Sequence, residues 1–426
     1  MERDSLTVLS TRLRPPRSAY LHIPFCHRRC FYCDFPVVPL GDRADGDRSG
    51  SIEAYMELIC GEILTSTHGP PLSTVYIGGG TPSMLTSEQI GRLLKTLEQQ
   101  FGFAQAAEVS LELDPASFNA VKLAGFLQAG VNRVSLGCQS FDDALLAALG
   151  RRHQRHDIYR SVKWLQQAQA RGEIASWSLD LIQGLPLQAG QKQLQLGHTA
   201  LMHWSQQLDQ AINLEPPHLS IYDLIVEPGT VFAWRQDRGE LLLPTEDLGA
   251  DLMEMTWRRL TEAGYGHYEI SNYALPGHTS RHNRVYWNGA GWWGFGLGAT
   301  SAPYGLRLSR PRTRAAYADW LAQAKGEEQI SARSGMPVDE ILMVGLRQRE
   351  GVNMEKLAAE HDLSIGQIHA LRQRLKPFER QGTLLVQGPR WKLSDPAGLA
   401  ISNSIIREIL DWWEQTCQSQ PAHAAA

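Results

Sequence analysis

The sequence predicts an α/β protein in which an incomplete (β/α)6 barrel is followed by a small, mainly helical, winged-helix-like C-terminal domain. Three observations support this fold class. Strand and helix patterns alternate over the first half of the chain, polar residues recur where the strands end, and a helix, helix, hairpin order closes the chain. Such alternation is typical of a parallel sheet joined by crossover helices. A chain of 426 residues is long enough for more than one domain.

The predicted strands are short apolar runs, and the predicted helices carry apolar residues at helical spacing. Strands are expected at 19–24, 74–77, 108–113, 133–139, 177–182 and 218–225. Helices are expected at 52–66, 86–100, 118–128, 144–149, 157–170 and 194–212. Thr86 and Gln89 are spaced as a capping box at the start of the second helix. About six strand–helix repeats fit an open sheet or a partial barrel.

We divide the chain into five regions. Residues 1–18 are expected to form a flexible arm, and residues 19–230 the partial barrel. Residues 231–334 form an irregular segment, with a helix at 246–262, that completes the core. Residues 335–415 form the C-terminal helical domain, and residues 416–426 a disordered tail. The C-terminal pattern consists of helices at 338–349, 354–361, 365–379 and 401–413 and a hairpin at 384–386 and 391–393.

Composition and charge exclude several classes of protein. The net charge of −4 argues against a charge-driven nucleic-acid binder. Arg372, Arg374, Lys376 and Arg380 are therefore interpreted as a solvated helix face. No apolar run is long enough for a transmembrane segment, and the polar N-terminus does not resemble a secretory signal. Six cysteines are too few for a disulfide scaffold in a chain of this length, so we expect a protein of the reducing cytoplasm.

Half of the cysteines lie in one short stretch. Cys26, Cys30 and Cys33 have the spacing C-x3-C-x2-C directly after the first predicted strand. Three thiolates can hold three corners of a [4Fe–4S] cluster and leave one iron open to another ligand. A zinc site completed by His22 or His27, or cysteines buried in the core, are the alternatives. The remaining cysteines, Cys60, Cys138 and Cys417, are interpreted as free thiols.

Polar residues follow the predicted strands at their C-terminal ends. They are Gly78 to Thr81, Glu112, Gln139 and Asp180. In a parallel barrel this end of the sheet carries the active site. Glycines there let the backbone approach a ligand closely, and carboxylates can accept hydrogen bonds from amino or hydroxyl groups. A ligand site that faces the cysteine loop is therefore expected.

The cysteine spacing and the Gly-Gly-Gly-Thr-Pro run after the second strand resemble the radical S-adenosylmethionine (SAM) superfamily. That resemblance implies a partial barrel, a [4Fe–4S] cluster and SAM bound at the open iron. Further motifs are similar to those of coproporphyrinogen III oxidase-like proteins. These motifs are Tyr-x-His-Ile-Pro-Phe-Cys, Leu-Glu-Leu-Asp-Pro, Gly-Cys-Gln-Ser-Phe, Leu-Gly-Arg-Arg-His and Asp-Leu-Ile-Gln-Gly-Leu-Pro. The resemblance implies that SAM contacts Tyr20, Gly79, Gly80, Thr81, Glu112, Gln139, Arg151 and Asp180.

One departure separates this chain from the oxidase. The oxidase carries a further cysteine two residues after the third, and Phe35 stands there in this sequence. The Cys-Asp-Phe ending resembles instead the sister family HemW, a haem chaperone family. Arg281 to Trp287 also matches the HNxxYW motif of that family. This match implies a haem site formed by His282, Asn283, Tyr286 and Trp287, with His282 as a candidate iron ligand. His267, His278 and His361 are the other candidate ligands.

The function expected from the sequence is that of a haem chaperone. It would bind a [4Fe–4S] cluster, SAM and haem, and it would pass haem to an acceptor haem protein whose identity the sequence does not give. SAM could be cleaved to a radical or serve only as a ligand, so no catalytic residue is assigned. The first alternative is an oxygen-independent coproporphyrinogen III dehydrogenase, against which Phe35 argues. The second is a radical enzyme that modifies nucleic acid, against which the charge argues.

Overall fold

A nine-stranded sheet with the strand order β11-β1-β4-β5-β6-β7-β8-β10-β9 forms the frame of the molecule. The computed structural model describes residues 15–42, 44, 46–47, 49–186, 193–305, 307–323 and 335–418. Residues 1–14 of the expected arm and 419–426 of the expected tail lie outside this description. The first strand begins at residue 18, which was expected to belong to the arm. The last helix continues to residue 418, which was expected to belong to the tail.

Six consecutive parallel strands confirm the predicted strand–helix alternation. They are β1 (Ser18–Ile23), β4 (Leu72–Gly79), β5 (Phe103–Leu113), β6 (Arg133–Gln139), β7 (Ser176–Gln183) and β8 (His218–Asp223). The crossover helices are α1 (Gly50–Thr65), α2 (Ser87–Phe101), α3 (Ala120–Gln128), α4 (Asp143–Ala148), α5 (Arg155–Ala170) and α6 (Gln193–Asn213). The predicted capping box of Thr86 and Gln89 is present at the start of α2.

The segment after the barrel extends the sheet at both edges. β11 (Trp293–Phe295) pairs in parallel with β1, while β10 (Asn272–Ala274) pairs antiparallel with β8 and with β9 (Gly266–Glu269). Because β11 and β9 are the two ends of the strand order, the sheet is a partial barrel. The same segment holds α7 (Val231–Asp237), α8 (Glu246–Glu262), α9 (Arg281–Asn288) and α10 (Arg314–Gln323). The shorter elements are β2 (Phe25–Cys26), β3 (Val38–Pro39), η2 (Pro82–Met84), β12 (Thr300–Ser301) and β13 (Leu308–Ser309).

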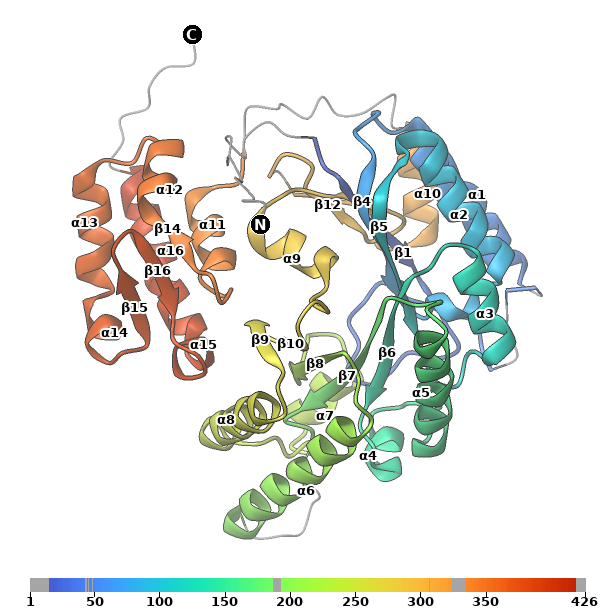
Figure 1. The fold of residues 1–426 in the computed structure, drawn as a ribbon, viewed down its shortest axis with the longest axis horizontal. Helices are drawn as coiled ribbons and strands as arrows, with labels where there is room; N and C mark the ends of the chain where they lie inside the picture. Colours follow the sequence, from blue (N-terminus) through green and yellow to red (C-terminus); the bar gives the residue numbers. More distant parts are fainter. Residues whose placement is uncertain are drawn as a thin grey trace.

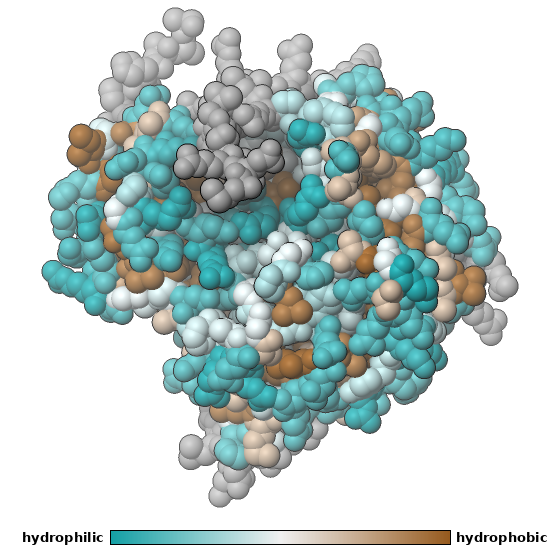
Figure 2. All heavy atoms as spheres, viewed as in Figure 1, coloured by the Kyte–Doolittle hydropathy of each residue, from teal (hydrophilic) through white to brown (hydrophobic). Residues whose placement is uncertain are grey.

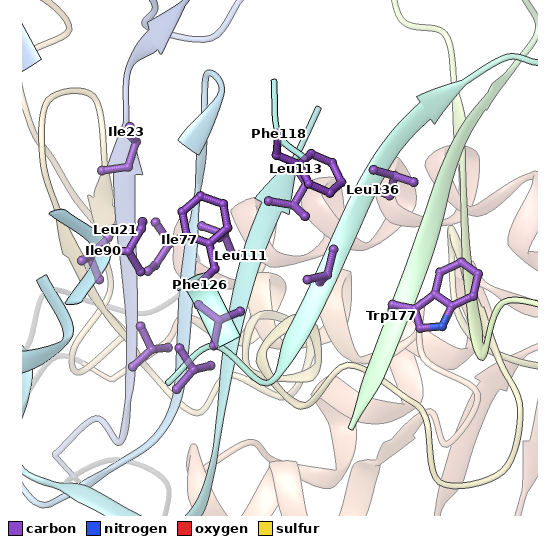
Figure 3. Packing of buried hydrophobic residues seen from close by; sticks show 14 of the residues in the cluster. Leu21, Ile23, Ile77, Ile90, Leu111, Leu113, Phe118, Phe126, Leu136 and Trp177 are labelled. Carbon is purple, nitrogen blue, oxygen red and sulfur yellow. The ribbon is translucent and has the colours of Figure 1, made fainter. Parts of the chain in front are cut away.

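The main core lies between the sheet and the helices on its outer face. Leu111 and Leu113 project from β5 and Leu136 from β6 toward helix side chains such as Ile90 and Phe126 (Figure 3). Alternate residues of a strand point to the same face, so this set leaves the other face of each strand free to line the inside of the barrel. Each fully buried side chain of this kind contributes about 1.5–3 kcal/mol to stability. Helix α9 lies on the inner side of the sheet, opposite α2, α3 and α5 (Figure 1).

The C-terminal domain has its own hydrophobic core and packs beside α9 (Figure 1). Its helices are α11 (Val338–Gly345), α12 (Met354–Glu360), α13 (Ile365–Arg374), α14 (Lys376–Arg380), α15 (Ala397–Ala400) and α16 (Ser402–Gln418). The predicted hairpin, β15 (Leu384–Gln387) and β16 (Arg390–Leu393), gains a third strand, β14 (Val352–Asn353). The single helix predicted at 365–379 is wrong. It divides into α13 and α14 because Pro377 cannot continue the hydrogen-bond pattern of α13.

Candidate functional site

A cavity of about 500 Å³ opens at the C-terminal ends of β4 to β8, where the sequence predicted a ligand site. It brings the cysteine loop opposite the polar strand ends. The residues predicted to bind a cluster or SAM that line it are Cys26, Cys30, Cys33, Gly79, Gly80, Thr81, Glu112, Gln139, Arg151 and Asp180. Phe35 also lines the cavity, and 52% of its surface is exposed. Tyr20 is the predicted SAM contact that does not reach this wall.

The three clustered thiols are free and share one wall of the cavity. Burial raises the pKa of the Cys26 thiol to about 12, and the Thr81 hydroxyl, 3.5 Å from its Sγ, partly offsets this. Bound iron would reverse that preference, because a coordinating thiol is deprotonated outright. Among the described residues, no three His, Cys, Asp or Glu side chains converge as the ligands of a single metal ion do. A cubane cluster does not require such convergence, because each thiolate binds a different iron.

His22 fixes the cysteine loop rather than offering a metal ligand. Its Nδ1 lies 3.0 Å from the Tyr20 hydroxyl, and its Nε2 lies 3.0 Å from the Pro36 carbonyl oxygen. The Tyr55 hydroxyl also donates a 2.7 Å hydrogen bond to the His22 carbonyl. Burial lowers the pKa of His22 to about 4, so the ring is neutral at pH 7. Both ring nitrogens are thus engaged, which disfavours His22 as the fourth ligand of a zinc site.

The glycines after β4 let the backbone pass close to the cysteine loop. A Cβ atom at Gly80 would lie 2.9 Å from Cys26 Sγ and 2.7 Å from the Phe25 carbonyl oxygen. Gly79 has a φ of +117°, which side chains rarely allow, and a Cβ there would lie 2.7 Å from the His22 ring. Any side chain at these positions would push the loop away from the strand. The Gly-rich run is therefore required by packing.

Glu112 and Asp180 form the polar wall opposite the thiols. Glu112 accepts hydrogen bonds from the Tyr76 hydroxyl at 2.9 Å and from the Gly79 N–H at 3.0 Å. Burial nevertheless raises the pKa of Glu112 to about 7. Asp180 accepts from Ser135 Oγ at 2.6 Å and from Ser178 Oγ at 3.3 Å, and burial raises its pKa as well. Two desolvated carboxylates in one cavity form a favourable site for cationic or hydroxyl-bearing groups.

Gln139 occupies an unusual backbone position at the end of β6. Its φ is +65°, and the register between β6 and β7 shifts between Gly137 and Gln139. A side chain in the left-handed region costs free energy, and such strain is concentrated at functional sites. The shift turns Gln139 into the cavity, while Cys138 before it is fully buried in the core. Cys138 thus points away from the thiols of the loop.

Arg151 is held by protein groups on the cavity wall. Its Nη2 donates to Asp114 Oδ2, and its Nη1 donates to Cys30 Sγ at 3.4 Å. Burial raises the pKa of Asp114, but Arg151 outweighs it and holds that pKa well below its usual range. The family resemblance implied that Arg151 contacts SAM, whereas this guanidinium is already paired with Asp114. Arg151 places its positive charge beside Cys30, which would carry a negative charge as a thiolate.

The sequence did not single out several residues of the cavity. Tyr76, Asp114, Ser135 and Tyr222 all line it. Asp114 stands two residues after Glu112, so strand alternation places both side chains on the same face. That signal could have found Asp114. Tyr76 precedes Gly78 by two residues and Ser135 precedes Gly137 by two, so the same alternation places both on the cavity face.

The inner face of α9 is buried against the barrel. His282 is fully buried, with its Nδ1 2.8 Å from Thr74 Oγ1 and its Nε2 2.8 Å from the Tyr286 hydroxyl. The ring of His282 stacks on the ring of Tyr76, with 5.3 Å between the ring centroids. The ring of Tyr76 also stacks on that of Tyr20, with 6.3 Å between the centroids. Burial lowers the pKa of His282 to about 3. In this arrangement neither nitrogen of His282 faces a cavity, so ligation of iron would require both contacts to break.

The outer face of α9 points toward the C-terminal domain. Asn283 and Trp287 are partly exposed on this face, one helical turn apart. Gln348 Nε2 donates a 2.7 Å hydrogen bond to the Trp287 carbonyl, and Arg284 pairs with Glu350 at 2.5 Å. The four motif residues therefore divide between two environments. His282 and Tyr286 face the barrel, while Asn283 and Trp287 face the domain junction.

Comparison with known proteins agrees with the fold. Residues 20–186 match the radical SAM superfamily and residues 337–400 match the HemN C-terminal domain. A Synechocystis protein named heme chaperone HemW is 39% identical over 92% of this chain and 96% of its own length. HemW of Lactococcus lactis is 34% identical over 93% and 98%. The solved structure of Escherichia coli coproporphyrinogen III oxidase, described as a radical SAM enzyme, has the same fold, with a TM-score of 0.73 at 21% identity over 95% and 91%.

The partial barrel, the cysteine loop and the glycine-rich strand end define a radical SAM protein. More particularly, the chain belongs to the HemW family. Membership of the radical SAM superfamily implies a [4Fe–4S] cluster and SAM. None of the helices in the described part of the chain has the length and apolar character needed to span a membrane. The face of the molecule seen in Figure 2 is mostly hydrophilic, with apolar residues in separate small groups.

Proposed function

We propose that this chain is a haem chaperone that carries a [4Fe–4S] cluster and SAM in the main cavity, binds haem, and passes it to an acceptor haem protein. The observation that carries the proposal is the cavity wall beside the thiols. Phe35 lines it, half exposed, at the position where the oxidase resemblance requires a fourth clustered cysteine. The relatives named heme chaperone HemW, similar over nearly the whole chain, support the same function.

In this proposal Cys26, Cys30 and Cys33 hold the cluster. When bound, such a cluster provides an open iron for SAM and can supply an electron to it. The backbone at Gly79, Gly80 and Thr81 approaches the methionine end, where side chains would not fit. Arg151 compensates the charge of the Cys30 thiolate and orients Asp114.

The polar wall of the cavity would orient the rest of SAM. Glu112 and Asp180 accept from amino or ribose hydroxyl groups, and Gln139 contributes an amide that can donate or accept. Tyr20 would act indirectly, because its ring stacks on Tyr76 and its hydroxyl is hydrogen-bonded to His22. We assign no catalytic residue. The cavity volume of about 500 Å³ lies in the range of sites for ligands of this size.

Haem binding is proposed for the region of the HNxxYW motif on α9. The experiment is a titration of the purified, cluster-loaded protein with haem, followed by the Soret absorbance. A saturable Soret band with a stoichiometric end point is expected. If haem adds only linearly, as it does to a protein without a site, the chaperone function is refuted.

An oxygen-independent coproporphyrinogen III dehydrogenase is the second candidate, because the fold of the Escherichia coli coproporphyrinogen III oxidase matches the fold of this protein over most of both chains. Such an enzyme would remove two propionate carboxyl groups of the substrate as CO2. Anaerobic turnover with SAM, a reductant and coproporphyrinogen III distinguishes the two functions. We expect no protoporphyrinogen, and its stoichiometric formation would favour the dehydrogenase. A Phe35→Cys variant in the same assay tests whether that position alone withholds the activity.

A further inference from the structure

A second cavity, of about 400 Å³, lies between the end of α9 and the C-terminal domain. It is separate from the cluster cavity and shares no lining residue with it. Trp287, the last residue of the HNxxYW motif, forms part of its wall, as do the segment around Tyr304 and helices α11 and α12. Its volume lies within the range of cavities that hold cofactors.

The walls of this cavity suit a flat, largely apolar ligand. The indole of Trp287 and the ring of Tyr304 offer aromatic surface, and Met336, Val344 and Leu357 add apolar surface. Glycines make up an unusual share of the lining, namely Gly289, Gly291, Gly305, Gly335, Gly345 and Gly351. At Gly291, Gly305, Gly345 and Gly351 a Cβ atom would lie within 2.7 Å of protein atoms, so these glycines let the cavity wall pack closely. A Cβ atom at Gly289 would come within 3.4 Å of Met336 Sδ, so the thioether already borders this surface.

The polar residues of the cavity include two cations. Lys356 lies 3.9 Å from Glu360 in a partly exposed ion pair. Arg390 donates from Nη1 to the carbonyl oxygens of Glu350 at 2.9 Å and Gly351 at 3.5 Å. Arginine and lysine are the usual partners of carboxylates. Glu360 also lines the cavity as the partner of Lys356, so a ligand carboxylate would take its place beside that lysine. Two cations beside an apolar wall fit a planar molecule that carries two carboxylates.

The candidate iron ligands can now be compared by position. His282 is fully buried between Thr74 and Tyr286. His267 is buried, with its Nδ1 2.7 Å from Asp395 and its ring stacked on Tyr273 at 4.1 Å. His278 has its Nδ1 3.1 Å from Ser176 Oγ, whereas His361 lines the junction cavity, as Trp287 does. Imidazole and thioether are both established ligands of haem iron.

We propose that haem is seated in this junction cavity, with His361 as its iron ligand, Trp287 against the porphyrin face, and Lys356 and Arg390 at the propionates. This inference rests on the proposed haem-binding function and specifies its site. It assigns His282 the role of a positioning residue, which anchors α9 so that Trp287 faces the cavity. A seat between a motif helix and a separate domain also gives a route for release, since displacement of that domain exposes the ligand.

The test compares haem titrations of the full-length, cluster-loaded protein and two variants. His361→Ala removes the ligand, and Ala290→Trp places a bulky side chain on the cavity wall at an exposed position. We expect the Kd for haem to rise at least tenfold in both. Added imidazole should restore the low-spin spectrum of His361→Ala but not of Ala290→Trp. His369→Ala, an exposed histidine on the neighbouring helix α13, is the matched control and should bind as wild type does.

The outcomes separate this inference from the proposed function. If the wild-type protein has no saturable haem site, the chaperone function itself fails. If wild type binds haem and both variants bind within twofold of it, the function stands and the junction cavity is not the seat. Thermal unfolding of each variant, together with its iron content, identifies loss of binding that comes from misfolding. If one variant misfolds, the other decides the question.

Discussion

The hydroxyl of Tyr76 on β4 donates a hydrogen bond of 2.9 Å to Oε1 of Glu112 on the neighbouring strand β5. The ring of the same tyrosine stacks on His282 of α9 at 5.3 Å. One side chain therefore contacts both the polar wall of the main cavity and the HNxxYW helix. Tyr76, which the sequence analysis did not identify as a site residue, therefore connects the two parts of the site.

The first prediction concerns the pH dependence of stability through Glu112. Its pKa is raised from 4.5 to about 7 by burial, so the folded chain holds this proton more tightly than the unfolded chain. By linkage, folding stability from this group is retained at low pH and is lost as pH rises from about 4.5 to 7. Glu112→Gln removes the titration. Relative to wild type, the variant should gain about 1–3 kcal/mol between pH 4.5 and pH 8.

Urea unfolding of the cofactor-free proteins at several pH values measures this difference. The Glu98→Gln variant changes an exposed carboxylate on α2 and serves as the control. A stability difference between Glu112→Gln and wild type that does not vary with pH would show that Glu112 titrates normally.

The second prediction concerns the cluster ligands. Cys30→Ala removes one of three thiolates and, with it, an iron ligand. After anaerobic reconstitution, this variant should lose most of its iron and sulfide and its brown absorbance. Cys417→Ala changes an exposed thiol at the far end of the chain and should keep wild-type iron content. Equal iron and sulfide in the two variants would remove Cys30 from the ligand set.

The third prediction concerns the loop that carries these cysteines. His22→Ala removes the contacts to the Tyr20 hydroxyl and the Pro36 carbonyl, and leaves buried polar groups without partners. Each such loss costs about 1–3 kcal/mol. We expect faster loss of the cluster in air and lower cluster occupancy, with the three thiols intact. His156→Ala, on an exposed helix position, is the control. Cluster lifetimes equal to wild type would mean that the loop is held by other contacts.

The fourth prediction concerns His282. Its replacement by Ala breaks the contacts with Thr74 and Tyr286 and opens space beneath Tyr76. A loss of about 2–4 kcal/mol in the free energy of unfolding is expected, even without haem. The exposed control His369→Ala should change stability by less than about 0.5 kcal/mol. A cofactor-free His282→Ala protein as stable as wild type would indicate that His282 is not the anchor of α9.

The sequence predicted the parts of the fold that depend on local pattern. The parallel strands and the polar strand ends follow from periodicity and strand–helix alternation, so Glu112, Gln139 and Asp180 were placed correctly at one edge. The cysteine loop was found from spacing alone. What the sequence did not predict depends on contacts between distant segments. Strands of two residues, such as β14, carry no periodic signal, and α9 has only eight residues, few of them apolar.

The site itself was predicted only in part for a similar reason. Successive residues of a helix point about 100° apart, so the neighbours His282 and Asn283 face different surroundings, and only the packing of α9 shows what those surroundings are. The junction cavity depends on where the C-terminal domain packs, and His361 belongs to that domain. Arg151 was expected to meet a ligand, but Asp114, two residues from Glu112, is its partner.

Haem transfer tests the central claim most directly. Protein loaded with its cluster and with haem is mixed under anaerobic conditions with an apo form of a b-type haem protein, and the holo form of that acceptor is measured by its own Soret band after separation. We predict that the acceptor gains haem in an amount that matches the loss from this protein, faster than dissociated haem alone is taken up. Transfer no faster than passive dissociation from the loaded protein would contradict the account.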